Sequence, residues 1–452
     1  FKYYFDKKNI IKTFFFSNCL YNILYKYFLK NFMLIVRGQN RLKGEIVVSG
    51  SKNAALPIIG ASLLLAGKVK LNQVPKIGDV NTFLDILSGI GVKYFWEENS
   101  LILDSTSLNN DNLNFEKIKK IRSSIFLLSP LLYFFKSINI PFPGGCKIGK
   151  RPIDAHLNGL KAIGYDYEFD GDNIKLNGEL EEGEKILNAG FGVSSTENLI
   201  VANVLRQGKT IIKNSAIEPH VMNLVDFMRM AGADIKIKYN HEIIIEGVAE
   251  LNSDFEFEVV ADYIEAGTYM VIAALASEKY LDIKNARIED LYTFIEKLKE
   301  SGVKVEDLGN DILRVYKAEK IKPVSIQTNI FPGFPTDLQS PFAILQSQAD
   351  GTSRINEVMF EGRLNFLVEL EKMTAKIAIL NPHEAMIFGP NLLRGTTVTS
   401  WDLRAGMAMI IAGLIATGET TVTNVEYIYR GYENFVQKLK DLGADITEIY
   451  NS

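Results

Sequence analysis

The 452-residue chain has few of the residues that build cross-links and metal sites. It contains two cysteines, Cys19 and Cys146, and four histidines. Two cysteines cannot form a disulfide framework, and so few thiols and imidazoles leave little for a structural metal site. The sequence therefore predicts a cytoplasmic protein with neither a bound metal nor a cofactor.

The chain also lacks an excess of charge of one sign. It has 50 Lys and Arg residues against 54 Asp and Glu residues, a net charge of −4. Such a balance creates no global field that would attract nucleic acid or a membrane surface. The sequence has no clean run of about 18 apolar residues, as a membrane helix needs. We expect no nucleic acid and no membrane as partners, and an anionic substrate would need cations gathered locally.

Residues 1–32 differ from the rest of the chain because they are crowded with Phe, Tyr, Lys and Asn. Asn18, Asn22 and Lys26 interrupt the apolar run, and no small-residue cleavage site follows it, so the segment is not typical of a secretory signal. We interpret residues 1–32 as an extension without a role in function. Met33 is then the working start, and a chain beginning there should keep full activity.

From Met33 on, a helix that ends in a turn and is followed by two short strands recurs six times. The period is about seventy residues. Glycine suits the left-handed conformation that ends many helices, and five of the six turns carry it, whereas the fifth copy has a threonine. The turn positions are Gly91, Gly164, Gly232, Gly302, Thr374 and Gly443.

A second, more apolar helix in each unit leads into a strand, most clearly at residues 53–74, 196–217, 265–286 and 404–425. There the hydrophobic period changes from helical to alternating. The order of strands and helices predicts an α/β protein. Six units suit two pseudo-symmetric domains of three βα-containing repeats each, with apolar helices inside and sheets outside.

The segment PFPGGCKIGKRPID, residues 141–154, places Cys146 beside paired glycines and a cationic run. Gly144 to Lys150 fit most of a phosphate-binding P-loop, but Arg151 stands where that loop needs a Ser or Thr hydroxyl for magnesium. A cysteine phosphatase loop has five residues between its Cys and Arg. Here only four separate Cys146 from Arg151.

A third interpretation takes the glycines as a source of flexibility, so that the loop can move over a substrate. Lys147, Lys150 and Arg151 would then favour the thiolate form of Cys146. A surface hairpin with an incidental cysteine is the remaining alternative from these residues alone.

Charged residues stand where several other helices should begin. Lys52 and Asn53 precede an apolar helix, Arg122 opens the segment RSSIFLLSPLL, and Asp337 follows a Pro-Gly turn. Each has an ordinary explanation, such as a helix cap or a solvated cation. Taken together, they would converge if the repeats face each other.

These residues carry a resemblance to a known family. SGSKNAALP, IRSSI, PGGCKIGKRPIDAH, FPTDLQ, FEGRL, DLRAG and IYRGYE occur in the order found in the UDP-N-acetylglucosamine 1-carboxyvinyltransferases, a family of enolpyruvyl transferases. The resemblance runs from Met33 to the C-terminus. It implies two inside-out α/β domains with the active site between them. One domain would span residues 53–260 and the other would combine residues 33–52 with 261–452.

The resemblance also implies an activity: transfer of enolpyruvyl from phosphoenolpyruvate to the 3′-hydroxyl of UDP-N-acetylglucosamine, with release of phosphate, at the start of peptidoglycan synthesis. Asp337 would act as the base and Cys146 as the loop acid, with Asp402 as a second acidic partner. Phosphoenolpyruvate would be held by Lys52, Asn53, Arg122, Arg151, Arg363, Arg404 and Arg430, of which Lys52 and Arg430 are also assigned to catalysis. The nucleotide sugar would contact Asn53, Arg122, Arg151, Pro152, Ile153, Asp154, Ala155, Val193, Ser194, Asp337 and Met359.

Two departures from the family pattern and two rival functions remain. The chain has Gly192-Val193-Ser194 where the family commonly has Ser-Val-Gly, and Met359 replaces a smaller aliphatic residue. The related transferase that uses shikimate 3-phosphate shares the fold, but the loop around Cys146 argues against it. A catalytically inactive repeat protein that binds nucleotide sugars is the rival from another class. For the assembly we expect a monomer or a weak homo-oligomer.

Overall fold

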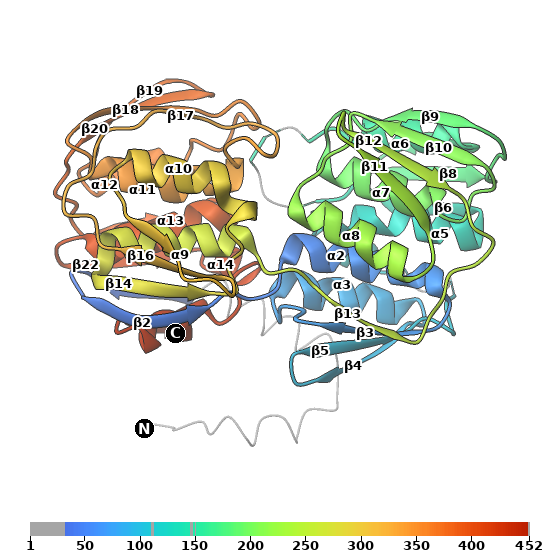
Figure 1. Ribbon diagram of the computed structural model, residues 1–452, viewed down its shortest axis with the longest axis horizontal. Coiled ribbons are helices and arrows are strands. Elements are labelled where there is room, and N and C mark those ends of the chain that lie inside the picture. The colour runs from blue at the N-terminus through green and yellow to red at the C-terminus, as the bar shows by residue number, and fades with distance from the viewer. Residues whose placement is uncertain (1–31, 110–112, 145–147, 150, 451–452) are drawn as a thin grey trace.

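The computed structural model describes residues 32–109, 113–144, 148–149 and 151–450. These residues form two lobes that lie side by side (Figure 1). Predictions that fall on residues 1–31 and on Cys146 lie outside the described residues. Within the described part of the chain, no helix has both the length and the apolar character that crossing a bilayer requires.

The N-terminal lobe runs from α2 to β13. Its longer helices are α2 (Lys52–Ala61), α3 (Gly78–Gly89), α5 (Leu128–Phe135), α6 (Asp154–Ala162), α7 (Val193–Asn203) and α8 (Pro219–Met230), with short turns at α4 (Phe115–Ile118), η1 (Ser62–Leu65) and η2 (Arg122–Leu127). Its strands are β3 (Lys68–Asn72), β4 (Lys93–Glu97), β5 (Ser100–Asp104), β6 (Ser137–Pro141), β7 (Tyr165–Asp170), β8 (Asn173–Gly178), β9 (Lys185–Asn188), β10 (Lys209–Lys213), β11 (Asp234–Lys238), β12 (Glu242–Glu246) and β13 (Phe255–Glu258).

The C-terminal lobe combines β1 and β2 with everything from α9 onward. Its helices are α9 (Tyr263–Ala276), α10 (Tyr292–Glu300), α11 (Gln339–Ser347), α12 (Leu367–Lys372), α13 (Leu403–Ile415), α14 (Glu426–Tyr429) and α15 (Phe435–Asp441), with 3-10 turns at η3 (Glu289–Leu291) and η4 (Thr336–Leu338). Its strands are β1 (Phe32–Arg37), β2 (Leu42–Val47), β14 (Ser277–Lys284), β15 (Val305–Asp307), β16 (Ile312–Tyr316), β17 (Ile326–Gln327), β18 (Gly351–Asn356), β19 (Lys376–Asn381), β20 (Glu384–Gly389), β21 (Thr397–Thr399), β22 (Glu419–Thr423) and β23 (Asp445–Tyr450).

The described strands form six small sheets, three in each lobe, and Figure 1 shows them on the outside of the helices. In the N-terminal lobe the orders are β13-β3-β5-β4, β6-β8-β7 and β11-β12-β10-β9. In the C-terminal lobe they are β15-β16-β14-β2, β17-β18-β20-β19 and β21-β22-β1-β23. This inside-out arrangement of α/β repeats confirms the predicted fold.

The repeat is visible in the backbone at the six turns. All six turn residues have a positive φ, and they follow α3, α6, α8, α10, α12 and α15: Gly91 at 90°, Gly164 at 112°, Gly232 at 101°, Gly302 at 90°, Thr374 at 76° and Gly443 at 103°. Thr374 adopts the conformation despite its branched side chain, whose Oγ1 donates a hydrogen bond to the carbonyl of Leu392 at 2.8 Å. The turn geometry is therefore common to all six units.

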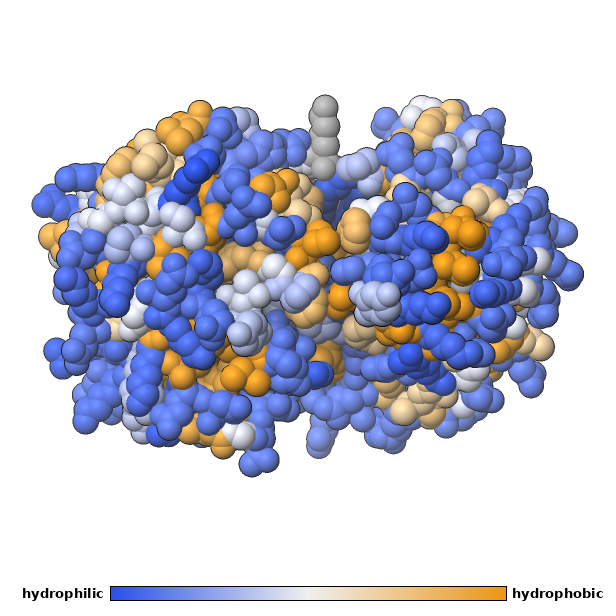
Figure 2. Space-filling model, turned by 45° about the horizontal axis from the view of Figure 1, so that its top comes forward, coloured by the Kyte–Doolittle hydropathy of each residue, from blue (hydrophilic) through white to orange (hydrophobic). Residues whose placement is uncertain are grey.

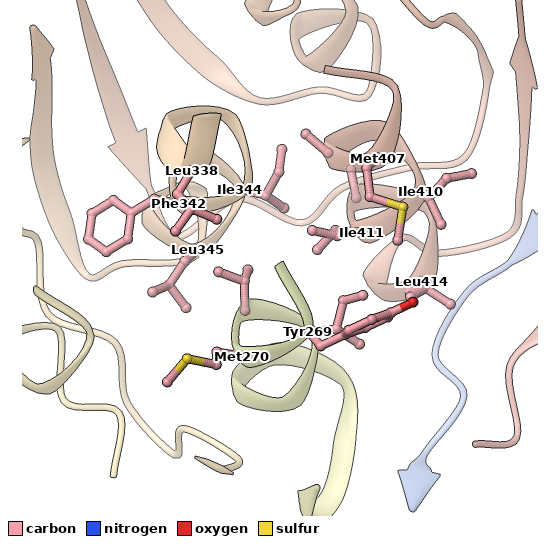
Figure 3. Close-up of a cluster of buried hydrophobic side chains, with 14 of the residues drawn as sticks. Tyr269, Met270, Leu338, Phe342, Ile344, Leu345, Met407, Ile410, Ile411 and Leu414 are labelled. Carbon is pink, nitrogen blue, oxygen red and sulfur yellow. The ribbon is translucent and has the colours of Figure 1, made fainter. Parts of the chain in front are cut away.

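The core of the C-terminal lobe lies where α9, α11 and α13 pack against one another (Figure 3). Tyr269 and Met270 of α9, Phe342 of α11, and Met407 and Ile411 of α13 belong to one cluster, and all five side chains are buried. Helices that are apolar on every side belong inside a protein, because each has no face to offer to water. Burial of one such side chain contributes about 1.5–3 kcal/mol. The first residues of α9 and α13 also reach the cavity between the lobes, which Tyr263, Leu403 and Arg404 help to line.

Two adjacent chain crossings join the lobes. Ser51 N donates to Val260 O at 2.7 Å, and Asp262 N donates to Ser49 O at 2.9 Å, so the crossings pair with each other. One hydrophobic core draws its residues from 32–48 and 261–446, and the other from 54–259. We propose on this basis that the domains divide as expected, at 33–52 plus 261–452 and 53–260. β1 already begins at Phe32, whose ring is buried.

Candidate active site

A cavity of about 690 Å³ is lined by residues from both lobes. It gathers most of the predicted site residues, which are far apart in the sequence. They are Lys52, Asn53, Arg122, Arg151, Pro152, Ala155, Val193, Ser194, Asp337, Met359, Arg363, Asp402, Arg404 and Arg430. The predicted residues therefore lie around one cavity. The role assigned to each of them stays a prediction.

Two predicted residues do not line the cavity. Ile153 is buried in the core of the N-terminal lobe, and Asp154 is the exposed first residue of α6. Both nevertheless adjoin residues that do, namely Pro152 and Ala155. Cys146 lies outside the described residues, but its neighbour Ile148 lines the cavity.

Asp337 lies between two arginines. Its Oδ1 accepts a hydrogen bond from Arg363 Nη2, and its Oδ2 lies 3.5 Å from Arg404 Nε. Burial alone would raise the pKa of Asp337, but the charges of Arg363, Arg404 and Lys52 outweigh it and hold this pKa well below the ordinary value. The carboxylate is ionised at neutral pH and can accept a proton. Asp337 lies inside the turn η4, not at its cap, which is Pro335.

Arg363 and Arg404 are held by tertiary packing, with side chains only 7% and 3% exposed. The Arg404 guanidinium lies 5.1 Å from the centre of the Tyr432 ring. Arg363 Nε and Arg404 Nη1 have no hydrogen-bond partner although they are buried. Unpaired guanidinium donors beside a cavity are suited to bind a carboxylate or a phosphate.

Asp402 has a structural role that the sequence did not predict. It is the N-cap of α13, and its Oδ1 accepts hydrogen bonds from the amides of Arg404 at 2.8 Å and Ala405 at 3.0 Å. A capping carboxylate satisfies amides that the helix leaves unpaired. Asp402 thereby also fixes the backbone from which the Arg404 side chain extends. Its expected role as an acidic partner stays a prediction.

The remaining cations come from the beginnings and ends of helices. Lys52 opens α2, Arg122 opens η2 and Arg430 caps the C-terminal end of α14. Arg122 Nη2 donates a hydrogen bond to the carbonyl of Arg151 at 2.7 Å. Burial, together with the charge of Arg151, lowers the pKa of Arg122 to about 10, so the group remains a cation at neutral pH. The cavity thus gathers several cations from both lobes, beside acidic side chains such as Asp337 and Asp402.

Sequence reasoning missed several further residues of the cavity wall, among them Asp79, Glu197, Glu218 and His220. Burial, reinforced by the charge of Glu218, raises the pKa of Glu197 well above its ordinary value. Burial also lowers the pKa of His220 to about 4. A glutamate inside the apolar helix TENLIVAN was a signal that could have pointed to Glu197. For Asp79 no local signal existed, because its partners come from distant segments.

Buried polar atoms without a hydrogen-bond partner gather at this cavity. Among the described residues that line it, they include Ser123 Oγ, both carboxyl oxygens of Glu197, Glu218 Oε2, His220 Nδ1, Arg363 Nε and Arg404 Nη1. Native proteins leave few buried polar atoms unpaired, because each costs about 1–3 kcal/mol. Such a concentration points to a polar ligand that completes the hydrogen bonds.

The surface around the junction of the lobes is mixed in character. In Figure 2, hydrophilic side chains cover most of the face turned to the viewer, and hydrophobic ones form smaller patches, some of them where the lobes meet. Ligand sites commonly occur at such domain interfaces, where a few polar groups converge in a largely apolar cleft.

Comparison with solved structures agrees with the fold. The enolpyruvyl transferase NikO from Streptomyces tendae superposes with a TM-score of 0.85 at 22% identity, covering 94% of this chain and 100% of that one. An EPSP synthase from Acinetobacter baumannii superposes with a TM-score of 0.70 at 18% identity, covering 92% and 99%. At these identities the likeness concerns the fold alone.

Comparison with sequences is more specific. Residues 36–439 match the pattern of the EPSP synthase (3-phosphoshikimate 1-carboxyvinyltransferase) family. The UDP-N-acetylglucosamine 1-carboxyvinyltransferase of Halothermothrix orenii is 40% identical over 415 residues, which cover 92% of this chain and 99% of that protein. That of Campylobacter jejuni is 40% identical over 418 residues with the same coverage. The resemblance inferred from the motifs is confirmed, and the chain belongs to the UDP-N-acetylglucosamine 1-carboxyvinyltransferase family of enolpyruvyl transferases.

Proposed function

We propose that the protein transfers the enolpyruvyl group of phosphoenolpyruvate to the 3′-hydroxyl of UDP-N-acetylglucosamine and releases phosphate. This reaction supplies peptidoglycan synthesis. The observation that carries the proposal is the Asp337 carboxylate held between Arg363 and Arg404 in a cavity that also contains Lys52 and Arg430. We further propose that the enzyme is cytoplasmic and acts as a monomer or a weak homo-oligomer, without a cofactor or a metal.

The cations suit the donor substrate. Phosphoenolpyruvate carries a phosphate and a carboxylate, and one pair of unit charges 4 Å apart is worth about 4 kcal/mol at an effective dielectric constant near 20. Lys52, Arg122, Arg151 and Arg430, with the neighbouring Asn53, bind the phosphate region. Arg363 and Arg404 bind the carboxylate, because both line the cavity and Arg363 Nε and Arg404 Nη1 have no hydrogen-bond partner there.

The acceptor is held on the side of the N-terminal lobe. Helix α7 begins at Val193 without a side-chain cap, so its first amides and the positive end of its dipole are available to the diphosphate. Arg122 and Arg151 add charge to the same group. The contacts proposed for the nucleotide sugar are Asn53, Arg122, Arg151, Pro152, Ile153, Asp154, Ala155, Val193, Ser194, Asp337 and Met359.

The reaction proceeds by addition and elimination. Asp337 takes the proton of the 3′-hydroxyl, whose oxygen bonds to C2 of phosphoenolpyruvate while C3 gains a proton and becomes a methyl group. The product of this step is a tetrahedral ketal that still carries the phosphate. The C2–O bond to the phosphate then breaks, the methyl group loses a proton, and the double bond re-forms. Cys146 donates to C3 the proton that is gained in the addition. Its thiolate takes a methyl proton back in the elimination and so assists the departure of phosphate, with Asp402 as a second acidic group.

The low pKa of Asp337 fits a base that gains strength when the donor is bound. Without substrate, Arg363 and Arg404 stabilise the ionised carboxylate. When the anionic donor engages these two guanidiniums, their hold on Asp337 weakens and its pKa rises towards the range of an effective base.

The decisive assay is phosphate release from phosphoenolpyruvate. Release should require UDP-N-acetylglucosamine, and shikimate 3-phosphate should not replace it. Fosfomycin, an epoxide that alkylates thiols, should add to Cys146 in the presence of the nucleotide sugar and abolish the release. Phosphate release that ignores the nucleotide sugar, or an unchanged intact mass after fosfomycin treatment, would contradict the proposal.

A further inference from the structure

Asp79 makes an ionic contact with two cations of the cavity at once. Its Oδ1 accepts a hydrogen bond from Arg430 Nε at 2.7 Å, and its Oδ2 lies 3.5 Å from Arg430 Nη2 and 3.6 Å from Lys52 Nζ. The Asp79 side chain is only 8% exposed, and those of Lys52 and Arg430 are 17% and 20% exposed. Three charged groups with so little access to water interact much more strongly than they would on the open surface.

The contact joins the two lobes. Asp79 belongs to the first turn of α3 in the N-terminal lobe, whereas Arg430 ends α14 in the C-terminal lobe. A second contact lies beside it, because the amide of Lys76 donates a hydrogen bond to Glu433 Oε1 at 2.8 Å. Residues 76–79 therefore dock on the segment that carries Arg430.

The carboxylate fixes cations that would otherwise repel each other. Lys52 and Arg430 both reach the cavity and both approach the same Asp79 side chain. Two like charges that share one carboxylate would repel each other and turn apart if that anion were removed. With Asp79 in place, both stay directed towards one point, where an incoming phosphate meets donors that need no rearrangement.

We propose that Asp79 is a positioning residue that aligns Lys52 and Arg430, across the interface of the lobes, for the phosphate of the donor substrate. Asp79 itself takes no part in proton transfer. The inference rests on the proposed function, since it concerns the phosphate that this reaction releases.

The test is the steady-state kinetics of Asp79→Asn, which keeps the shape of the side chain and removes its charge. We expect kcat/KM for phosphoenolpyruvate to fall at least tenfold, while KM for UDP-N-acetylglucosamine stays within twofold. Asp79→Glu, which restores the carboxylate one methylene further out, should recover part of the loss. The proposal would be overturned if kcat/KM for phosphoenolpyruvate fell less than tenfold in Asp79→Asn. It would also be overturned if kcat/KM fell equally for phosphoenolpyruvate and for UDP-N-acetylglucosamine.

Two matched controls test whether the effect of Asp79→Asn comes from the position of the cations. The alternatives are a loss of folding and a weaker contact between the lobes. Asp85→Asn removes an exposed carboxylate from the same helix, one that pairs with Lys117 at 2.8 Å, and should leave the kinetics unchanged. Glu433→Gln weakens the neighbouring contact between the lobes without touching either cation. If Glu433→Gln reproduces the kinetic loss of Asp79→Asn, Asp79 acts by docking the lobes and the proposal is wrong.

A crystal structure of the wild-type protein with inorganic phosphate gives a readout that needs no turnover. We expect the phosphate to contact Lys52 Nζ and the Arg430 guanidinium while both still contact Asp79. Cations that leave Asp79 when they bind phosphate, or a phosphate that binds neither of them, would count against the proposal. Failure of wild-type phosphate release would instead remove the proposed function, and this structure would still decide the role of Asp79.

Discussion

Arg404 Nε lies 3.5 Å from Asp337 Oδ2, so a buried arginine and the proposed base share one wall of the cavity. Arg363 contacts the other carboxyl oxygen. This arrangement keeps Asp337 ionised in the empty cavity and couples its basicity to whatever anion the two arginines bind.

Asp337→Asn should lower kcat by about 10³-fold, because a positioned general base contributes about 10²–10⁴-fold and the amide cannot take the hydroxyl proton. KM for phosphoenolpyruvate should not rise, since the arginines that bind it lose a competing anion. The measurement is phosphate release at saturating UDP-N-acetylglucosamine. Asp350→Asn, at an exposed carboxylate paired with Lys320, is the control and should behave as wild type. Retention of a tenth of the activity or more would exclude Asp337 as the base.

The same substitution should alter stability in acid. The folded state lowers the pKa of Asp337 below the unfolded value of about 3.9. The stabilisation is therefore fully present above that pH and is lost as the pH falls towards the folded pKa. Asp337→Asn should unfold more easily than wild type at pH 7, by about 2 kcal/mol as for other hydrogen bonds to charged groups. Urea unfolding should show this gap closing below about pH 4; a gap independent of pH would contradict the linkage.

His156 should make the protein sensitive to mild acid. Burial, with the charge of Arg122, lowers its pKa to about 3. Asn198 Nδ2 lies 3.0 Å from His156 Nδ1, and Ser194 Oγ lies 3.1 Å from Nε2, an arrangement that suits the neutral ring with its proton on Nε2. The unfolded state gains a proton below about pH 6.5 whereas the folded state does not, so stability falls as the pH drops from there towards 3.

The matching experiment compares wild type with His156→Gln by urea unfolding at pH 7.5 and 5.5. Between pH 7.5 and 5.5 the free energy of unfolding should fall by about 1 kcal/mol more for the wild type than for the variant. The reason is that His156 binds a proton in the unfolded state but not in the folded state. His220 contributes a similar loss to both proteins, since its pKa is lowered to about 4. An equal pH dependence of wild type and variant would show that His156 is not held neutral.

Gly91→Ala should destabilise the N-terminal lobe. Gly91 has φ 90°, and a Cβ there would lie 2.1 Å from the carbonyl oxygen of Ser107. Backbone strain and the clash together should lower the free energy of unfolding by about 2–3 kcal/mol. Gly171→Ala is the matched control, since Gly171 also has positive φ, 59°, but open space around its Cβ position. The control should cost about 1 kcal/mol, from conformation alone. Thermal unfolding of both variants checks the difference, and equal melting temperatures would refute the clash.

The repeat was predictable from the sequence because its signals are local. A glycine after an amphipathic helix needs only its own backbone to adopt the left-handed conformation. Gly91 and Gly443 therefore stand where the pattern placed them. Even Thr374, the weakest copy, takes the same conformation, with help from a hydrogen bond to Leu392 that the sequence does not reveal.

The candidate site was only partly predictable. The motifs pointed to Lys52, Asp337 and Arg404, whose side-chain chemistry suits an anionic substrate. They did not reveal that Asp402 caps α13. Nor did the motifs reveal that Asp79 belongs to the site. In the sequence it is an ordinary aspartate in the first turn of a helix, and only its contacts with distant residues distinguish it.

The sequence by itself determined the α/β repeat, the apolar central helices and the chemical types available for binding an anion, because each follows from the order of neighbouring residues. Only the tertiary structure decided which of these groups meet. The Asp79–Arg430 contact and the placing of Asp337 between two arginines join segments from remote parts of the chain. Electrostatic energy depends on distance and on exclusion of water, and both are set when the two lobes close around one cavity.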